Sequence, residues 1–332
     1  MKDGFRQYWL WTSRIAIVVF GCLTSGLALQ NTPGLQRIRV ESALVTVPVI
    51  VKNSEGKFLT GLNADSFSLY QDSAPVPISL FLTSEDPVKI ALLLDTSVST
   101  KSILKKIKKA ARQFLQQLRS QDMAMIVSFD SQVDVLCPLS SNQRELKEAI
   151  KNAEVGGSTT RMRDAIHMIQ ERFRAIGGRK AIVLLSDGQD HGSRISSTDL
   201  QDSVAASSTL IYSVFYKVDP RKMMKSMGLS TNIPKSAKGQ PKGPYAGWES
   251  IERKAAQYLQ EISELGGGRF YRSNIDKLDE AFKQISKELR FQYMLGFYPE
   301  KSKLDGAMHS LDVRVAIPDV VINSRRSYRA VQ

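Results

Sequence analysis

The apolar residues near the start of the chain follow a short, alternating pattern. From Arg37 to Phe81 apolar and polar positions mostly take turns, most regularly along Val45–Val51, and Gly, Asn and Pro residues interrupt the runs. Period-two spacing with this punctuation is typical of β-strands. We therefore predict a small N-terminal β module over residues 36–84.

After Pro87 the pattern becomes that of an α/β domain. Ile90–Leu94 is a continuous apolar run, as expected for a strand that is buried on both faces of a parallel sheet. Apolar residues then recur at helical spacing within 101–119, while Lys and Arg occupy the other face. Further strands are expected at about 123–129, 181–185 and 210–216, and helices at about 143–152, 163–175, 249–265 and 277–289. This alternation predicts a doubly wound, mostly parallel sheet over 87–290, with helices on both faces.

The end of the chain returns to alternation, at 291–298 and again at 310–317. We expect the segment 291–330 to form β-strands that pack with the N-terminal module. Between 217 and 248 the periodicity disappears and Pro and Gly collect among basic residues, which predicts a surface insertion.

The first residues have the layout of a secretory signal. Three basic residues precede Ile15–Leu29, an uncharged and mostly apolar stretch that ends in small residues. We predict a signal peptide over 1–28 and an exported protein, periplasmic, extracellular or associated with the envelope. A retained membrane anchor is one alternative, and a lipid anchor at Cys22 is another because Val19–Cys22 resembles a lipobox.

The composition bears on the partners. The formal net charge is +13, which favours acidic partners. The chain has no zinc-finger spacing, no RNP-like aromatic motif and no helix-turn-helix pattern, so nucleic acid is not expected. Protein carrying acidic residues, or an anionic component of the envelope, fits this charge better.

Three polar segments follow predicted strands or precede a predicted helix. They are Asp95–Ser99, Gly156–Thr160 and Ser186–Gly188. In an open α/β sheet the loops at the carboxyl ends of the strands lie along one edge, where ligands bind. We therefore expect two carboxylates and several hydroxyl groups to meet there.

Oxygen donors of this kind suit a hard cation. Mg²⁺ prefers carboxylates, hydroxyls and water, and no soft ligand is present in the three segments. Ser97 and Ser99 are two positions apart, so that in an extended turn both can point the same way. The sequence predicts a Mg²⁺ site, with Mn²⁺ or Ca²⁺ as alternatives.

The combination of Asp95-x-Ser97-x-Ser99, a threonine in the Gly-Gly loop and Asp187 in a Ser-Asp-Gly turn resembles the metal-ion-dependent adhesion site of von Willebrand factor type A domains. The resemblance covers about residues 87–290 and implies the metal ligands Asp95, Ser97, Ser99, Thr160 and Asp187. Thr160 is preferred because it stands four residues before Asp164, as in the family's Thr-x-x-x-Asp-Ala pattern, and Thr159 is the alternative.

The flanking segments Val47–Val51 and Tyr293–Pro299 resemble those of exported bacterial A-domain proteins first grouped among the acidobacteria. In A domains an acidic residue of the partner completes the metal shell. The resemblance therefore implies an adhesion-type, metal-dependent protein-binding module that has no catalytic residues, no small-molecule substrate and no organic cofactor.

Other interpretations of these residues remain. Asp-Thr-Ser after a strand is also typical of a helix cap, and Asp164, Asp190 and His191 are expected to brace loops or face solvent. A structural, envelope-associated protein with a purely structural metal is the main functional alternative. A metal-dependent phosphoester hydrolase is a weaker one, because Asp-x-Asp, Gly-Lys-Ser/Thr, Gly-x-Ser-x-Gly and His-Glu-x-x-His motifs are missing at the required places.

Overall fold

The computed structural model describes residues 44–221, 247–300 and 304–330, all within one compact unit that spans 41–332. The expected signal peptide, the lipid-anchor position Cys22 and most of the expected insertion lie outside the described residues. Among those that are described, no helix is both long and apolar enough to span a bilayer.

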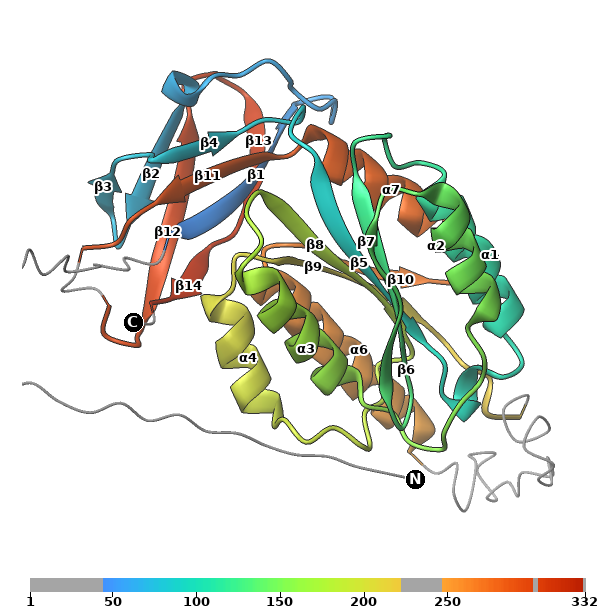
Figure 1. Cartoon of the computed structure of the whole chain (residues 1–332). Helices are drawn as coiled ribbons and strands as arrows, with labels where there is room; N and C mark the ends of the chain where they lie inside the picture. Colours follow the sequence, from blue (N-terminus) through green and yellow to red (C-terminus); the bar gives the residue numbers. More distant parts are fainter. Residues whose placement is uncertain (1–43, 222–246, 301–303, 331–332) are drawn as a thin grey trace, which may run out of the picture. The chain divides into compact units, whose positions relative to one another are not determined.

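A six-stranded sheet forms the centre of the α/β domain (Figure 1). Its strand order is β10-β9-β8-β5-β6-β7, and only β7 runs antiparallel to its neighbour. The strands are β5 (Val88–Asp95), β6 (Met123–Phe129), β7 (Val133–Ser140), β8 (Arg179–Ser186), β9 (Leu210–Tyr216) and β10 (Phe270–Ser273). β5 pairs with both β6 and β8, so its apolar run is buried on both faces.

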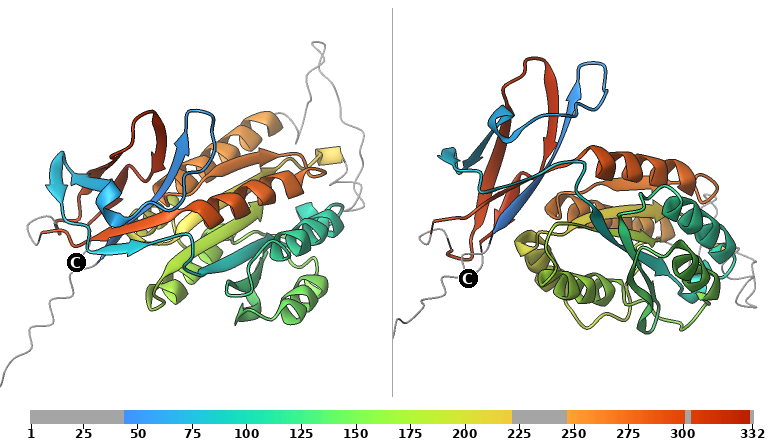
Figure 2. Two further views of the ribbon diagram at one scale, coloured as in Figure 1. Left: turned by 90° about the horizontal axis from the view of Figure 1, so that it is seen from above. Right: turned by 45° about the horizontal axis from the view of Figure 1, so that its top comes forward.

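Helices cover both faces of this sheet (Figures 1 and 2). One face packs against α1 (Leu104–Leu115), α2 (Gln143–Asn152) and α7 (Leu278–Phe291). The other packs against α3 (Met162–Arg174), α4 (Ser197–Ala206) and α6 (Trp248–Leu265). Phe114 of α1 and Phe282 of α7 stack with ring centroids 4.9 Å apart. The predicted doubly wound α/β fold is confirmed.

Strands from the two ends of the chain form a separate pair of four-stranded sheets, here called the β module. One sheet has the order β13-β1-β11-β4 and the other β14-β12-β2-β3. Their bounds are β1 (Val45–Asn53), β2 (Phe67–Gln71), β3 (Ala74–Val76), β4 (Leu80–Leu82), β11 (Tyr293–Phe297), β12 (Met308–Val315), β13 (Val320–Ser324) and β14 (Ser327–Arg329). Val47 lies opposite Leu295 in the register, so N- and C-terminal strands pair directly and share one apolar core.

Two buried arginines connect the β module and its linker to the α/β domain. Arg179, at the start of β8, donates to the carbonyl of Asp86 at 2.9 Å and also to that of Leu289 at the end of α7. Arg325, between β13 and β14, donates to the carbonyls of Ala205 and, at 2.8 Å, Ser207 just after α4. Both side chains thus satisfy backbone oxygens that helix and strand ends would otherwise leave without donors.

Some expected elements differ from the structure. The helix expected over 101–119 is shorter, because a 3₁₀ turn, η2 (Val98–Thr100), precedes α1 and the regular helix ends at Leu115. β7, α4 and β10 were not predicted, and β13 and β14 lie within the β-strands expected over 291–330 without having been placed individually. They are short or half-exposed, so their apolar periodicity is weak.

Candidate metal centre

Asp95 ends β5 and anchors the candidate site. Its side chain is fully buried, and its Oδ1 accepts hydrogen bonds from the backbone N–H of Ser97 at 3.0 Å and from the Ser97 hydroxyl at 2.5 Å. Its Oδ2 accepts from the hydroxyl of Ser186 at 2.9 Å, at the end of the neighbouring strand β8. The carboxylate is therefore held by its own loop and by the end of the neighbouring strand β8.

Ser99 bridges the two loops that carry the carboxylates. Its hydroxyl lies 3.0 Å from that of Ser97 and donates to Oδ2 of Asp187, also at 3.0 Å. Asp187 follows β8 and is buried, whereas Ser99 is half-buried. Asp95, Ser97, Ser99 and Asp187 thus form one hydrogen-bonded group whose outer member reaches the surface.

A tight turn sets the spacing of the two serines. Ser97 has extended backbone geometry, and its carbonyl accepts from the N–H of Thr100 at 2.9 Å and from the Thr100 hydroxyl at 2.8 Å. This closes the 3₁₀ turn η2 and returns Ser99 toward Ser97. The predicted common orientation of the two hydroxyls is present, although the turn is helical at Ser99 and not fully extended.

Asp130, which the sequence analysis did not single out, supports the Gly-Gly loop. It follows β6, and its Oδ2 accepts from the Thr96 hydroxyl at 2.8 Å. The Gly156 N–H donates to the Thr96 carbonyl at 3.0 Å, and any Cβ at Gly156 would overlap the Asp130 carboxylate. Asp130 stands just after a buried strand, as Asp95 does, and this position is the signal that could have identified Asp130 from the sequence.

Thr160 lies at the same edge but outside the hydrogen-bonded group. It is buried, and its carbonyl accepts from the N–H groups of His191 at 3.1 Å and Gly192 at 2.9 Å, in the loop that follows Asp187. Among the hydrogen bonds of the described residues, none joins its hydroxyl to Asp95, Ser97, Ser99 or Asp187. Thr159 is half-buried and lies against Gly192.

Asp164 braces two loops instead of facing the group. Its carboxylate accepts from the backbone N–H of Arg194 and Ile195, each at 3.0 Å, and pairs with Arg161 at 2.6 Å. Burial alone would raise the pKa of Asp164, but these hydrogen bonds and the Arg161 charge outweigh it and lower the pKa. Asp190 has a similar bracing role, since it accepts from the N–H of Arg163 at 2.8 Å.

The two carboxylates of the group are electrostatically unusual. Burial raises the pKa of Asp95 to about 8, and the nearby charge of Asp187 adds to the effect; burial also raises the pKa of Asp187. No Lys or Arg of the described chain forms an ion pair with either of them. A buried pair of like charges without a cationic side chain is the environment that a divalent cation would stabilise.

The donor set fits a hard divalent ion. It contains only carboxylate and hydroxyl oxygens, which suit Mg²⁺ more than a soft metal. Within the described parts of the chain, no three or more His, Cys, Asp and Glu side chains come together as a metal cluster. Any ion at this edge would therefore depend on the serine hydroxyls and on water for the rest of its coordination.

Comparison with known families identifies the class of the α/β domain. Residues 90–189, which include Asp95, Ser97, Ser99, Thr160 and Asp187, match the family model of the von Willebrand factor type A domain. The chain therefore contains a von Willebrand factor type A (vWA) domain. A search of curated proteins gave no match.

Solved structures resemble the chain at low identity. The protein BatB of Bacteroides thetaiotaomicron is 17% identical, with 61% of this chain and 97% of that chain covered and a TM-score of 0.44. A von Willebrand factor type A protein of Catenulispora acidiphila is 13% identical, covers 88% and 75% and has a TM-score of 0.47. Proximal thread matrix protein 1 of the mussel byssus, solved with a zinc-occupied MIDAS motif, is 14% identical, covers 67% and 50% and has a TM-score of 0.48.

Proposed function

We propose that this protein is an exported, divalent-cation-dependent protein-binding module of the adhesion type. vWA domains generally mediate protein interactions, often through a metal, and are usually not enzymes. The observation that carries the proposal is the bridge from Ser97 through Ser99 to Asp187, because it brings oxygen donors from two strand ends into one group.

Asp95, Ser97, Ser99, Thr160 and Asp187 are the proposed ligands, directly or through water, and Mg²⁺ is the proposed ion, with Mn²⁺ or Ca²⁺ as substitutes. The bound cation would supply a Lewis-acid position for a carboxylate. Ser186 fixes the orientation of Asp95, and Asp130 holds the Gly-Gly loop through Thr96. These supports keep the donors in place, so that little ordering is needed when an ion arrives.

The partner is proposed to present an Asp or Glu side chain to the ion. Ser99 is half-buried while Asp95 is fully buried, so an approaching carboxylate meets the site from the Ser99 side. A contact of this kind is charge-assisted and becomes stronger as water leaves it. The strongly basic chain would also increase the encounter rate with acidic proteins or anionic envelope components.

Proton relaxation with Mn²⁺ tests this function. A Mn²⁺ ion held by the group should keep exchangeable water and strongly enhance water relaxation, and a Glu-containing peptide in excess should reduce the enhancement by displacing that water. An equal effect from the matching Gln-containing peptide would contradict the adhesion mechanism. If the Glu-containing peptide leaves the relaxation enhancement unchanged, the alternative of a purely structural ion is favoured.

Export is the second part of the proposal and is supported by the pattern of residues 1–28. Cell fractionation together with mass spectrometry of the mature N-terminus tests it. Cleavage after residue 28 is expected. A lipidated Cys22 would instead indicate a lipid anchor, and an uncleaved N-terminus would indicate a retained membrane anchor. The likeness to the exported acidobacterial group belongs to this proposal as well.

A further inference from the structure

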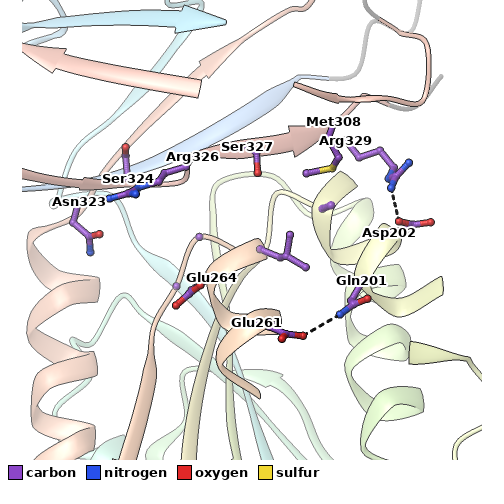
Figure 3. A pocket seen from close by; sticks show the side chains of 14 residues that line it. Gln201, Asp202, Glu261, Glu264, Met308, Asn323, Ser324, Arg326, Ser327 and Arg329 are labelled. Atoms are coloured by element: carbon purple, nitrogen blue, oxygen red, sulfur yellow. Dashed lines mark hydrogen bonds and ion pairs between the residues drawn. The ribbon is translucent and has the colours of Figure 1, made fainter. Parts of the chain in front are cut away.

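A groove of about 800 Å³ lies between the α/β domain and the β module (Figure 3). α4 and the end of α6 form one wall, and β12, β13 and β14 form the other. It lies near the carboxyl end of α4, just before β9 begins, whereas the candidate metal centre is at the carboxyl edge of the sheet. The groove is therefore separate from the metal centre, and its volume is within the ~300–1,000 Å³ of ligand pockets.

The helix wall is acidic. Glu261 and Glu264 are three positions apart on α6 and both line the groove, and Asp202 lines it from α4 (Figure 3). Asp202 pairs with Arg329 at 2.7 Å. Glu261 and Glu264 accept only from glutamine side chains, and no Lys or Arg within the described ranges pairs with them.

The strand wall has the opposite character. Arg326 is exposed, and Ser324 and Ser327 bring hydroxyl groups beside it. Met308, which is 44% exposed, and Leu265 add apolar surface between the two walls. The aliphatic part of a lysine or arginine could pack on this surface while its charged end reaches α6.

We propose that this groove binds an extended, lysine- or arginine-bearing segment of a partner protein. The cationic side chains pair with Glu261 and Glu264, and Arg326 donates to backbone carbonyls of the segment. Two features support this occupant over a small anion: the two carboxylates have no cationic partner among the described residues, and α6 ends here, which adds the negative end of its dipole. The proposal is independent of the metal centre.

Fluorescence anisotropy tests the proposal with a labelled decapeptide of alternating Lys and Ser, and with its Glu-Ser counterpart. All titrations contain EDTA, so that the metal centre makes no contribution. Saturable binding of the Lys peptide only is expected, with affinity that falls at high salt. No saturable binding, or equal binding of the Glu peptide, would overturn the proposal.

Paired variants locate the binding site. Glu261→Gln with Glu264→Gln should weaken the Lys peptide about tenfold, since two charge-assisted contacts are lost. The control, Glu148→Gln with Glu249→Gln, changes the net charge equally on exposed helix positions outside the groove and should bind as the wild type does. Equal weakening in both pairs would mean binding through overall charge and would reject the groove.

A groove-filling variant gives a second measurement. Ser324→Trp places a large side chain in the groove without changing charge, and it should also weaken the peptide about tenfold or more. A thermal unfolding midpoint measured in parallel shows that the variant is folded. Unchanged affinity in folded Ser324→Trp would place the peptide elsewhere and contradict the proposal.

Discussion

The hydroxyl of Ser99 donates a 3.0 Å hydrogen bond to Oδ2 of Asp187, a residue 88 positions further along the chain. This contact joins the loop after β5 to the loop after β8. Together with the hydrogen bond from Ser186 to Asp95, it links the two halves of the candidate metal centre, so its removal tests whether the halves act together.

Ser99→Ala should weaken Mg²⁺ binding about tenfold, because it deletes one oxygen donor and releases Asp187 from its partner. Isothermal titration calorimetry measures the change. Ser102→Ala is the matched control, since Ser102 is exposed and three residues away. If both variants bind Mg²⁺ like the wild type, Ser99 has no part in coordination.

Gly188→Ala should destabilise the fold by about 1–3 kcal/mol. Gly188 has φ +75°, and a Cβ there would lie 3.0 Å from the carbonyl oxygen of Ala255 in α6. Urea unfolding measures the loss. Gly177→Ala is the control, because that position has no atoms within 4 Å of its Cβ, and a similar cost in both variants would contradict the steric explanation.

Arg325→Met should lower the free energy of unfolding by about 3 kcal/mol, since it leaves the carbonyls of Ala205 and Ser207 without their donor. Arg326→Met, at the exposed neighbouring position, should cost less than about 0.5 kcal/mol. Denaturant titration compares the two. An Arg325→Met protein as stable as Arg326→Met would show that the β module is held by other contacts.

His309 should make stability depend on pH. Burial alone would lower the pKa of His309, but hydrogen bonds and charges from Asp72 and Asp305 outweigh it and raise the pKa above its ordinary 6.5. Because the pKa of His309 is higher in the folded state than in the unfolded state, protonation of His309 stabilises the fold. This stabilisation is complete below about pH 6.5 and is lost as the pH rises through the pKa of the folded state.

The unfolding free energy of the wild type minus that of His309→Gln should therefore be larger at pH 6 than at pH 9. Urea titrations at the two pH values give this difference. A difference that is constant, or larger at pH 9, would contradict protonation of His309 between the two carboxylates.

The long buried elements could be predicted from sequence because their patterns are unambiguous. Ile90–Leu94 has the continuous apolar pattern typical of a strand buried on both faces, and the Asp95-x-Ser97-x-Ser99 spacing places polar groups at its end. β7 was missed because it is a half-exposed antiparallel edge strand with irregular register to β6. Its periodicity carries little information for that reason.

The supporting residues of the site were harder to predict. The sequence indicates only a turn at Ser186, yet its hydroxyl holds Asp95, and this depends on β5 and β8 being neighbours. Asp130 depends in the same way on β6 lying beside β5. Which strands are adjacent is a property of the tertiary fold, and spacing along the chain does not encode it directly.

The most direct test of the metal centre is calorimetric titration of the purified protein with Mg²⁺, beside Asp95→Asn. Asn keeps the shape of the side chain and avoids the cost of a buried carboxylate charge beside Asp187, so the metal-free variant should melt at the same temperature or higher. The account predicts one Mg²⁺ per chain in the wild type and none in the folded variant. Equal binding by the two proteins, or none by the wild type, would contradict it.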